Sequence, residues 1–559
     1  MANPSVAISR QAPEGLKTLP RSDSQTEVLE LLAEPATHGA DGPVTRIDTH
    51  ASVVFLAGSS ALKLKRAVTF PFLDYSTLEK RKKACETEIA VNKDNAPTIY
   101  RGVVPVTRED DGRLAIGGAG EPVEWLVRMR RFDETMTLDH VAESGPLDDS
   151  MVIALAETFA QAHARAPRMP AEPWIDDLED YICQNKTAFL AEPDLYEPNR
   201  VRMLSAEAHA IHARIKPLLR QRGRMGFIRR CHGDGHLGNI VLIDGKPVLF
   251  DAIEFDDRVA TGDVLYDLAF VLMDLWDRGH RRNANLLLNH YLLVTHKISD
   301  LEDMGALPFY LMMRAAIRSK VTAARLAHIE GDARRAARAE AVRHFEFGER
   351  YLEPATPVLI AIGGLSGTGK TTLAHAIAPD LGHPPGAIVL RSDEERKIMF
   401  GLDPTDALPP EAYSQQVSGE VYSRVAEKAR AALAAGHSVI ADSVFAHPAA
   451  RDAIAAVARA ASAEFRGYWL EAQPTTLFER VAGRHGDASD ADVSVVKHQL
   501  GYRLGAISWT RIDAAGGPET TRDAVEEDLR ALRAQPARVP NPARADIRAA
   551  HRDPEKNPE

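Results

Sequence analysis

The sequence has few cysteines, no long apolar run and no excess of positive charge. Its three cysteines, Cys85, Cys183 and Cys231, form no C-x-x-C pair, so neither a disulfide framework nor a zinc knuckle is expected. The most apolar stretch, 265–275, carries two aspartates, which excludes a membrane-spanning helix there. The first fifteen residues, MANPSVAISRQAPEG, contain no apolar signal core. We therefore expect a cytoplasmic protein that has no membrane partner.

The charge balance also limits the class of partner. The 559 residues include 68 Lys and Arg against 79 Asp and Glu, which gives a formal net charge of -11. An acidic chain lacks the basic footprint of a dedicated nucleic-acid binder, so nucleic acid is not the expected partner. Hydrophobic residues make up 45% and charged residues 26%, as in ordinary globular proteins.

Two prolines, Pro354 and Pro357, divide the chain. Before them, strand-like segments at 52–56, 61–65 and 125–129 precede helical patterns from Met151 onward, which predicts an α+β domain. After them, strands alternate with helices, which predicts an α/β domain with a parallel sheet. We expect four parts: a flexible arm at 1–26, a first domain at 27–353, a second domain at 354–534 and a flexible tail at 535–559.

The strongest motif is Gly364-Leu-Ser-Gly-Thr-Gly-Lys-Thr371, which follows an apolar strand at 358–362 and opens a helix. Its glycines let successive backbone N–H groups curl around phosphate oxygens. Lys370 is expected to reach the β- and γ-phosphates and to act in catalysis, and Thr371 to ligate Mg²⁺. The expected nucleotide contacts are Gly364, Ser366, Gly367, Thr368, Gly369, Lys370, Thr371 and Thr372.

Three weaker patterns follow the phosphate loop. Asp393 comes directly after the next strand, where it could accept the proton of an acceptor hydroxyl, and Arg396 lies one helical turn further on; a simple helix cap is the alternative. Asp442 ends another buried strand and is either a metal ligand or a capping residue. Arg480 and Arg484 are spaced for one helix face, either on a mobile lid that contacts the phosphates or on a solvated surface.

The first domain contains a second constellation, around an Asp-Gly hairpin turn at 244–245. Asp234 and Asn239 precede the hairpin, and Asp251 follows it, so all three meet at its open end. This order matches the protein-kinase arrangement, in which the first Asp is the catalytic base and the other two residues hold Mg²⁺. His236, inside the same loop, is interpreted as a buried structural histidine.

A kinase of this kind also needs a lysine on an early strand and a glutamate on a helix. Lys63 and Lys65 alternate on one strand and point the same way. We expect Lys63 to contact the nucleotide, with Glu88 as its partner and Glu86 as the second choice; an exposed edge strand is the alternative interpretation. No glycine-rich loop of the G-x-G-x-x-G type precedes Lys63.

Both halves resemble known kinase families. The segments GLSGTGKTT, SDEER and VIADSVF resemble the AAA-type P-loop kinases, relatives of polynucleotide kinase and of small-molecule kinases; the resemblance implies that Asp393 is the acceptor-side base and Arg396 its partner. The segments HGDGHLGN, FDAIEF and GDVLYDLA resemble the aminoglycoside phosphotransferase and choline kinase family, which has a protein-kinase-like fold. This second resemblance implies the same roles for Asp234, Asn239 and Asp251, and a supporting role for Asp267.

The sequence thus predicts a bifunctional, ATP- and Mg²⁺-dependent phosphotransferase that acts on small-molecule hydroxyl acceptors. Two alternatives remain: an ATP-binding regulatory protein with little turnover, and a second domain that phosphorylates nucleic-acid 5′-hydroxyls. A helix with Arg314, Arg318 and Lys320 suggests an anionic acceptor or a domain contact, although a solvated face is the default interpretation. The acceptors and the oligomeric state are not specified by these patterns.

Overall fold

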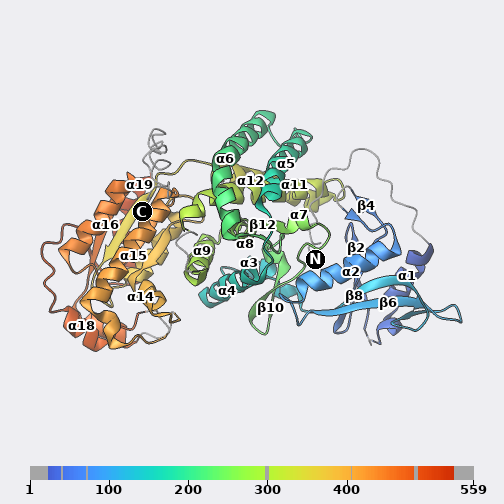
Figure 1. The fold of residues 1–559 in the computed structure, drawn as a ribbon, viewed down its shortest axis with the longest axis horizontal. Coiled ribbons are helices and arrows are strands. Elements are labelled where there is room, and N and C mark those ends of the chain that lie inside the picture. Colours follow the sequence, from blue (N-terminus) through green and yellow to red (C-terminus); the bar gives the residue numbers. More distant parts are fainter. Residues whose placement is uncertain are drawn as a thin grey trace, which may run out of the picture. The chain divides into compact units, whose positions relative to one another are not determined.

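The computed structural model describes residues 23–39, 42–70, 73–295, 301–403, 406–483 and 489–533 (Figure 1). The chain divides into two compact units, Met1–Leu352 and Glu353–Glu559, and the division falls at the double-proline segment. Each unit has its own sheet and its own core.

The first unit begins with a six-stranded antiparallel sheet in the order β1-β2-β3-β8-β6-β7. Its strands are β1 (Thr45–Asp48), β2 (Ser52–Ala57), β3 (Ser60–Lys65), β6 (Tyr100–Arg108), β7 (Leu114–Ile116) and β8 (Glu121–Arg130). Helix α2 (Leu78–Asn92) packs against β6 and β8 (Figure 1). The sheet therefore carries β3, with its two lysines, next to a helix that can present a partner.

Helices form the rest of this unit. They are α3 (Leu138–Glu143), α4 (Asp149–Arg165), α5 (Ala171–Leu190), α6 (Pro198–Met225), α7 (Asp257–Ala260), α8 (Val264–Asp277), α9 (Arg281–Thr295), α11 (Leu307–Arg325) and α12 (Gly331–Tyr351), with short 3₁₀ turns η1 (Pro35–His38), η2 (Glu134–Met136), η3 (Leu237–Asn239) and η4 (Asp303–Ala306). Three two-stranded pairs lie between them: β4 (Thr69–Phe70) with β5 (Leu73–Asp74), β9 (Ile228–Arg230) with β12 (Thr261–Asp263), and β10 (Ile240–Ile243) with β11 (Lys246–Leu249).

Regular structure begins closer to the N-terminus than the sequence predicts. Helix α1 (Asp23–Ala33) begins inside the segment 1–26 that we expected to be a flexible arm, so that prediction is wrong for residues 23–26. The reason is a buried amide: Gln25 donates to Glu124 Oε2 at 2.8 Å and to the Lys65 carbonyl at 3.0 Å. Val28 and Leu32 then bury the apolar face of α1 against the sheet. Residues 1–22, and the expected tail at 535–559, lie outside the described residues.

The second unit has a five-stranded parallel sheet in the order β14-β15-β13-β16-β17. The strands are β13 (Val358–Gly363), β14 (Ile388–Arg391), β15 (Val439–Asp442), β16 (Glu464–Glu471) and β17 (Thr510–Asp513). The helices and 3₁₀ turns are α13 (Lys370–Ile377), η5 (Ala378–Asp380), α14 (Ser392–Phe400), η6 (Pro410–Tyr413), α15 (Gln415–Ala434), α16 (Pro448–Ala461), α17 (Pro474–Ala482), α18 (Val493–Gln499) and α19 (Pro518–Arg533).

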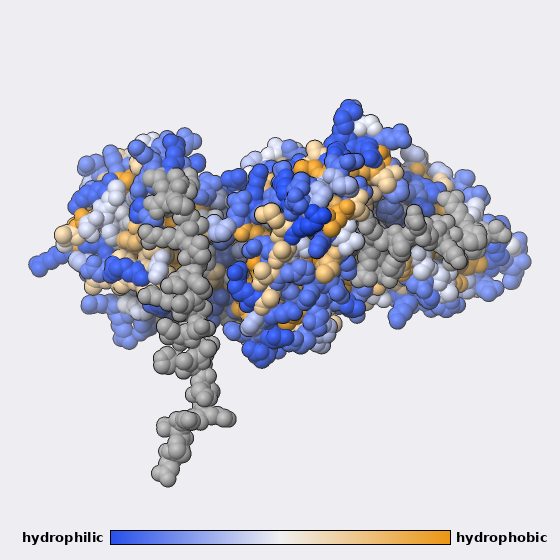
Figure 2. Space-filling view, turned by 90° about the horizontal axis from the view of Figure 1, so that it is seen from above, coloured by the Kyte–Doolittle hydropathy of each residue, from blue (hydrophilic) through white to orange (hydrophobic). Residues whose placement is uncertain are grey.

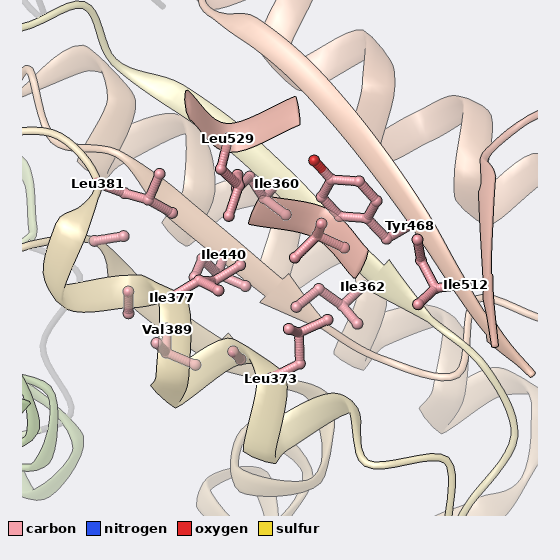
Figure 3. Packing of buried hydrophobic residues seen from close by; sticks show 14 of the residues in the cluster. Ile360, Ile362, Leu373, Ile377, Leu381, Val389, Ile440, Tyr468, Ile512 and Leu529 are labelled. Carbon is pink, nitrogen blue, oxygen red and sulfur yellow. The ribbon is translucent and has the colours of Figure 1, made fainter. Parts of the chain in front are cut away.

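The central strands of this sheet are continuously apolar because helices cover both of its faces. β13 lies in the middle and is buried at every residue, as expected for a parallel strand covered on both faces. Figure 3 shows Ile360 and Ile362 of β13 packed with Leu373 and Ile377 of α13 and with Leu529 of α19. This packing fixes the end of β13, and therefore the loop that follows it, relative to α13.

The observed architecture confirms the predicted fold class in both units: an α+β unit with an antiparallel sheet is followed by an α/β unit with a parallel sheet. Among the described residues, no helix is both long enough and apolar enough to cross a membrane. On the face seen in Figure 2, hydrophilic residues predominate, and hydrophobic residues form only small patches.

Two glycines of the second unit provide a matched test of its packing. A Cβ at Gly467, on β16, would lie 2.5 Å from ring atoms of Trp509, whereas a Cβ at Gly419, on α15, would meet nothing within 4 Å. We expect Gly467→Ala to destabilise the unit by about 1–3 kcal/mol through overpacking. Gly419→Ala should instead stabilise it by about 1 kcal/mol, because alanine is the better helix former.

Hydrogen exchange followed by mass spectrometry measures this difference in peptides that cover β13 and β16, and so reports on the second unit alone. Equal protection of those peptides in the two variants would contradict the packing described here.

Candidate active sites

Two buried lysines and three acids form the first site's central ion cluster. Lys63 Nζ lies 2.9 Å from Glu88 Oε1 and 2.8 Å from Asp251 Oδ1. Lys65 pairs with the other oxygen of Glu88 and with Glu254. Both lysines point to one face of β3 because side chains repeat every second residue in a strand. Burial alone would lower the pKa of Lys63, but Asp251 and Glu88 raise it well above its usual value.

Glu88 is thus the residue that pairs with Lys63. The second choice, Glu86, is exposed and lies 3.9 Å from Lys82 on the outer face of α2. Glu254 was inside a quoted motif, but sequence reasoning gave it no role. Its partner Lys65 is 189 residues away, so no local spacing could have revealed the pair.

The hairpin β10–β11 brings the three predicted residues of the catalytic loop together. Asp244 and Gly245 both have positive φ, 52° and 75°, as a two-residue turn of this kind requires. Asn239 Nδ2 donates to Asp234 Oδ2 at 3.0 Å and to the Asp234 carbonyl at 2.9 Å. Asp251, directly after the hairpin, is held by the Tyr100 hydroxyl, which accepts a hydrogen bond from its N–H at 3.1 Å.

Asp234 is buried in this loop, and that burial controls its protonation. Loss of solvent raises the pKa of Asp234 to about 7; the charges of Arg318 and Arg314 oppose the rise, and Asp251 adds to it. A carboxyl group with a pKa near neutrality is suited to take up a proton during a reaction. Burial also lowers the pKa of the neighbouring His236 to about 3, so this histidine is neutral.

Asp267 supports the catalytic loop from behind. Its Oδ1 accepts a hydrogen bond from the Gly233 N–H at 2.8 Å, and its Oδ2 lies 3.1 Å from His163 Nε2. Although burial opposes it, the hydrogen bond from His163 lowers the pKa of Asp267 to about 2. Arg314 donates to the Gly233 carbonyl at 3.1 Å, so both sides of the Gly233 peptide are fixed.

Behind the catalytic loop, the cluster of His163, Cys231 and Asp267 could in principle hold a metal ion, but its chemistry favours a structural role. His163, Cys231 and Asp267 offer ligand atoms that lie within 4.8 Å of one another. Burial, however, raises the pKa of Cys231 well above its usual value, and metals bind the thiolate. Both ring nitrogens of His163 already have partners, Asp267 and the Tyr291 hydroxyl.

A cavity of about 170 Å³ opens beside Lys63, Asn239 and Asp251. Its other walls are mostly apolar and include Leu56, Ala61, Ile99, Met129 and Phe250. A cavity with mostly apolar walls that also contains a lysine and two oxygen-bearing side chains suits a nucleotide, which combines an apolar base with charged phosphates. The amide of Asn239 and the carboxylate of Asp251 are the hard oxygen donors that Mg²⁺ prefers.

The second site is built on the loop between β13 and α13. Gly364, Gly367 and Gly369 have φ values of 141°, 85° and 86°, and a Cβ at Gly364 would lie 2.6 Å from the Leu470 carbonyl oxygen. Thr371 Oγ1 donates to Asp442 Oδ2 at 2.6 Å, so the two predicted magnesium ligands are in contact. Lys370 Nζ donates to the Leu365 carbonyl at 3.2 Å and thus curves back over the loop.

The other predicted loop contacts differ in exposure. Thr368 is buried and donates to the Leu365 carbonyl at 2.8 Å, whereas Thr372 is exposed on α13. Ser366 has a partner that sequence reasoning missed: Gln499 of α18 accepts from its N–H at 2.8 Å and donates to its hydroxyl at 3.0 Å. An isolated glutamine 133 residues away carries no motif, so only the fold could show this contact.

Of the two expected lid arginines, Arg480 lies among the described residues. Arg480 donates to the carbonyls of Ala514 at 2.8 Å and Gly516 at 2.6 Å. It therefore ties α17 to the turn after β17, where three adjacent carbonyl groups accept from it, and it also donates to the Gly367 carbonyl of the phosphate loop at 3.5 Å. Contact of Arg480 with the phosphates stays a prediction. Arg484 lies outside the described residues.

Asp393 and Arg396 begin α14 at the carboxyl end of β14. Asp393 is half-buried and makes no hydrogen bond or ion pair with any residue that the structure describes. Arg396 is buried, donates to the Ala412 carbonyl and lies over the Tyr413 ring, with 5.0 Å from Cζ to the ring centroid. The Asp393 carboxylate therefore has no fixed partner among the described residues, whereas Arg396 is held by η6.

Comparison with known proteins agrees with this division. The model of the phosphotransferase enzyme family matches residues 112–306, and that of an AAA domain matches residues 359–503. The first part of the chain thus matches the phosphotransferase enzyme family, and the second part matches an AAA domain. We call these parts the phosphotransferase domain and the P-loop domain.

Similar proteins match either most of this chain or a part of it. An uncharacterized protein of Mycobacterium tuberculosis is 29% identical over 516 residues, which cover 89% of this chain and 97% of the relative. A choline/ethanolamine kinase family protein of Mesorhizobium loti matches 59% of this chain and 95% of its own, with 15% identity and a TM-score of 0.34. A gluconokinase of Sinorhizobium meliloti matches 32% and 95%, with 19% identity and a TM-score of 0.23.

Glu88 and Glu86 form a matched pair for testing the ion cluster. Glu88→Gln leaves the buried Lys63 and Lys65 with one anion fewer, which should destabilise the phosphotransferase domain by about 3–5 kcal/mol. Glu86→Gln changes an exposed residue and should stay within about 0.5 kcal/mol of the natural chain. Urea unfolding followed by circular dichroism measures both; a Glu86→Gln effect as large as that of Glu88→Gln would contradict the described pairing.

Proposed function

We propose that both domains are ATP-dependent kinases, each of which transfers the γ-phosphoryl group of ATP to a hydroxyl acceptor with the help of Mg²⁺. The observation that carries the proposal is the single connected network of Lys63, Glu88 and Asp251, which adjoins Asn239 and Asp234 beside the cavity. The two family matches support the kinase class and imply the use of ATP.

In the phosphotransferase domain, Asp234 would take the proton of the acceptor hydroxyl. The hydroxyl oxygen forms a bond to the γ-phosphorus while the bond from that phosphorus to the bridging oxygen of ADP breaks, and ADP leaves with the electron pair. Lys63, held in place by Glu88, would contact the phosphates. Asn239 and Asp251 would hold Mg²⁺, which neutralises phosphate charge when it is bound.

In the P-loop domain the backbone does most of the binding. The N–H groups of the glycine-rich loop and the first turn of α13 would surround the phosphates, and Lys370 would neutralise them. Asp393 would accept the acceptor's proton, with Arg396 beside it. Thr371 and Asp442 would hold Mg²⁺, as their direct contact suggests. Lys370 would also stabilise the charge that develops on the transferred group.

Two substitutions assign each activity to its domain. With ATP, Mg²⁺ and a pool of small hydroxyl compounds, products of the phosphotransferase domain should disappear in Asp234→Asn and persist in Lys370→Ala. Products of the P-loop domain should show the reverse pattern. We expect each affected rate to fall by about 100-fold or more, because each change removes a group that takes a direct part in the proposed transfer. Transfer of label from [γ-³²P]ATP is the measurement.

Exposed residues of the same chemistry serve as controls. Asp244→Asn, at the hairpin turn, and Lys497→Ala, on the outer face of α18, should leave both sets of products unchanged. ATP binding without transfer to any acceptor would instead favour the regulatory alternative. Transfer to a 5′-hydroxyl oligonucleotide that depends on Lys370 would favour a nucleic-acid kinase in the P-loop domain.

A further inference from the structure

Helix α11 passes directly behind the catalytic loop of the phosphotransferase domain. Arg314 on this helix donates to the Gly233 carbonyl at 3.1 Å and to the Tyr266 carbonyl at 3.0 Å, and it stacks on the Tyr266 ring. Almost every residue of α11 from Leu307 to Ala323 is buried, so the expected solvated face is wrong. Arg318 lies one helical turn after Arg314 and therefore on the same face, toward Asp234.

Arg318 differs from the other buried arginines of this domain. It is only 8% exposed, yet it makes no hydrogen bond and no ion pair with any residue that the structure describes. Arg222 and Arg81, by contrast, are paired with the carboxylates of Asp263 and Glu124. A buried guanidinium without a hydrogen bond or ion pair is costly, and an anion that bound there would offset that cost.

His236 supplies a second unused donor at the same place. Its Nδ1 accepts a hydrogen bond from the Gly238 N–H at 3.1 Å, so the neutral ring carries its proton on Nε2. That Nε2 is buried, has no hydrogen-bond partner among the described residues and lies 3.7 Å from Asp234 Oδ2. A cation and an N–H group thus both remain unsatisfied next to the proposed base.

The acids around Arg318 do not satisfy it, because they are bound elsewhere. Asp274 accepts from Arg278 at 2.8 Å and from the Leu237 N–H at 3.0 Å. Glu340 lies 3.5 Å from His344 Nε2 on α12. None of them lies within ion-pair distance of the Arg318 guanidinium. The positive charge of Arg318 near Asp234 disfavours a cationic acceptor.

Resting on the kinase activity proposed above, we propose that the acceptor of the phosphotransferase domain is an anionic hydroxy compound, a carboxylate or a phosphate monoester. Its anionic group binds the Arg318 guanidinium and the His236 Nε2–H, and this places its hydroxyl at Asp234. The planar guanidinium suits both anions, because its N–H groups match two oxygens at once. The transfer itself balances as described above: the hydroxyl loses its proton to Asp234, and ADP is the leaving group.

The first experiment compares acceptors of one size and different charge. The full chain with Lys370→Ala is given [γ-³²P]ATP, Mg²⁺ and one of four probes: glycerate, glycerol phosphate, glycerol, or 2-amino-1,3-propanediol. We expect label on glycerate or on glycerol phosphate, and the two arms distinguish the carboxylate from the phosphate. Arg318→Gln should lower kcat/KM for that probe by about 10- to 100-fold, the usual effect of losing a hydrogen bond to a charged group.

The matched control is Arg343→Gln, an exposed arginine on α12, which should leave that value unchanged. Arg318→Lys keeps the positive charge but loses the planar guanidinium, so the fall in kcat/KM should be smaller than that of Arg318→Gln. The four probes are compared on a chain that retains Arg318. That comparison therefore tests the charge of the acceptor even if Arg318→Gln does not fold.

A second measurement needs no acceptor and therefore also applies if the natural acceptor is larger than these probes. Sulfate, at constant ionic strength and saturating ATP, should inhibit the Asp234-dependent hydrolysis of ATP by occupying the acceptor's anion position. Arg318→Gln should raise the inhibitory sulfate concentration by about tenfold or more. Equal sulfate sensitivity in the two chains, or transfer to glycerol or 2-amino-1,3-propanediol that Arg318→Gln does not alter, would overturn the inference and leave the kinase proposal intact. Hydrolysis that Asp234→Asn does not change would overturn the kinase proposal itself.

Discussion

The buried cluster of Lys63, Lys65, Glu88, Asp251 and Glu254 is the interaction on which the first domain's site depends. It joins three parts of the chain: strand β3, helix α2 and the segment after the β10–β11 hairpin. Two cations and three carboxylates in a nearly dry interior are stable only as a set, because each charge offsets the desolvation of its neighbours. The same ion pairs that hold the sheet to the hairpin therefore also fix the groups that face the cavity.

In our proposal, the two domains bind the charge of a nucleotide's phosphates with different chemistry. In the P-loop domain the binding groups would be backbone N–H groups, and the loop accordingly includes three glycines whose positive φ values larger residues do not adopt easily. In the phosphotransferase domain the binding groups would be side chains from distant elements, and their positions depend on packing. Preorganised groups of either kind stabilise charge without having to reorganise during the reaction.

The site beside Asp234 also shows how one helix can serve structure and recognition together. Arg314 is fully engaged with the backbone of the catalytic loop, whereas Arg318, one turn later, has no such partner among the described residues. The burial that raises the pKa of Asp234 also makes an unpaired guanidinium costly. In our proposal, a ligand that pairs with Arg318 lies beside Asp234, so its binding and its orientation are a single event.

By itself, the sequence determined the two fold classes, the phosphate loop and the Asp-Asn-Asp set, since each depends on short spacings that strands, turns and helix starts impose locally. It favoured Glu88 over Glu86 but could not show the contact with Lys63. Nor could it place Arg480 on carbonyls, find Gln499 at Ser366, or show that Arg318 is buried. Each of those depends on which distant elements pack together, since burial and the cost of desolvation exist only once the tertiary structure has removed the water.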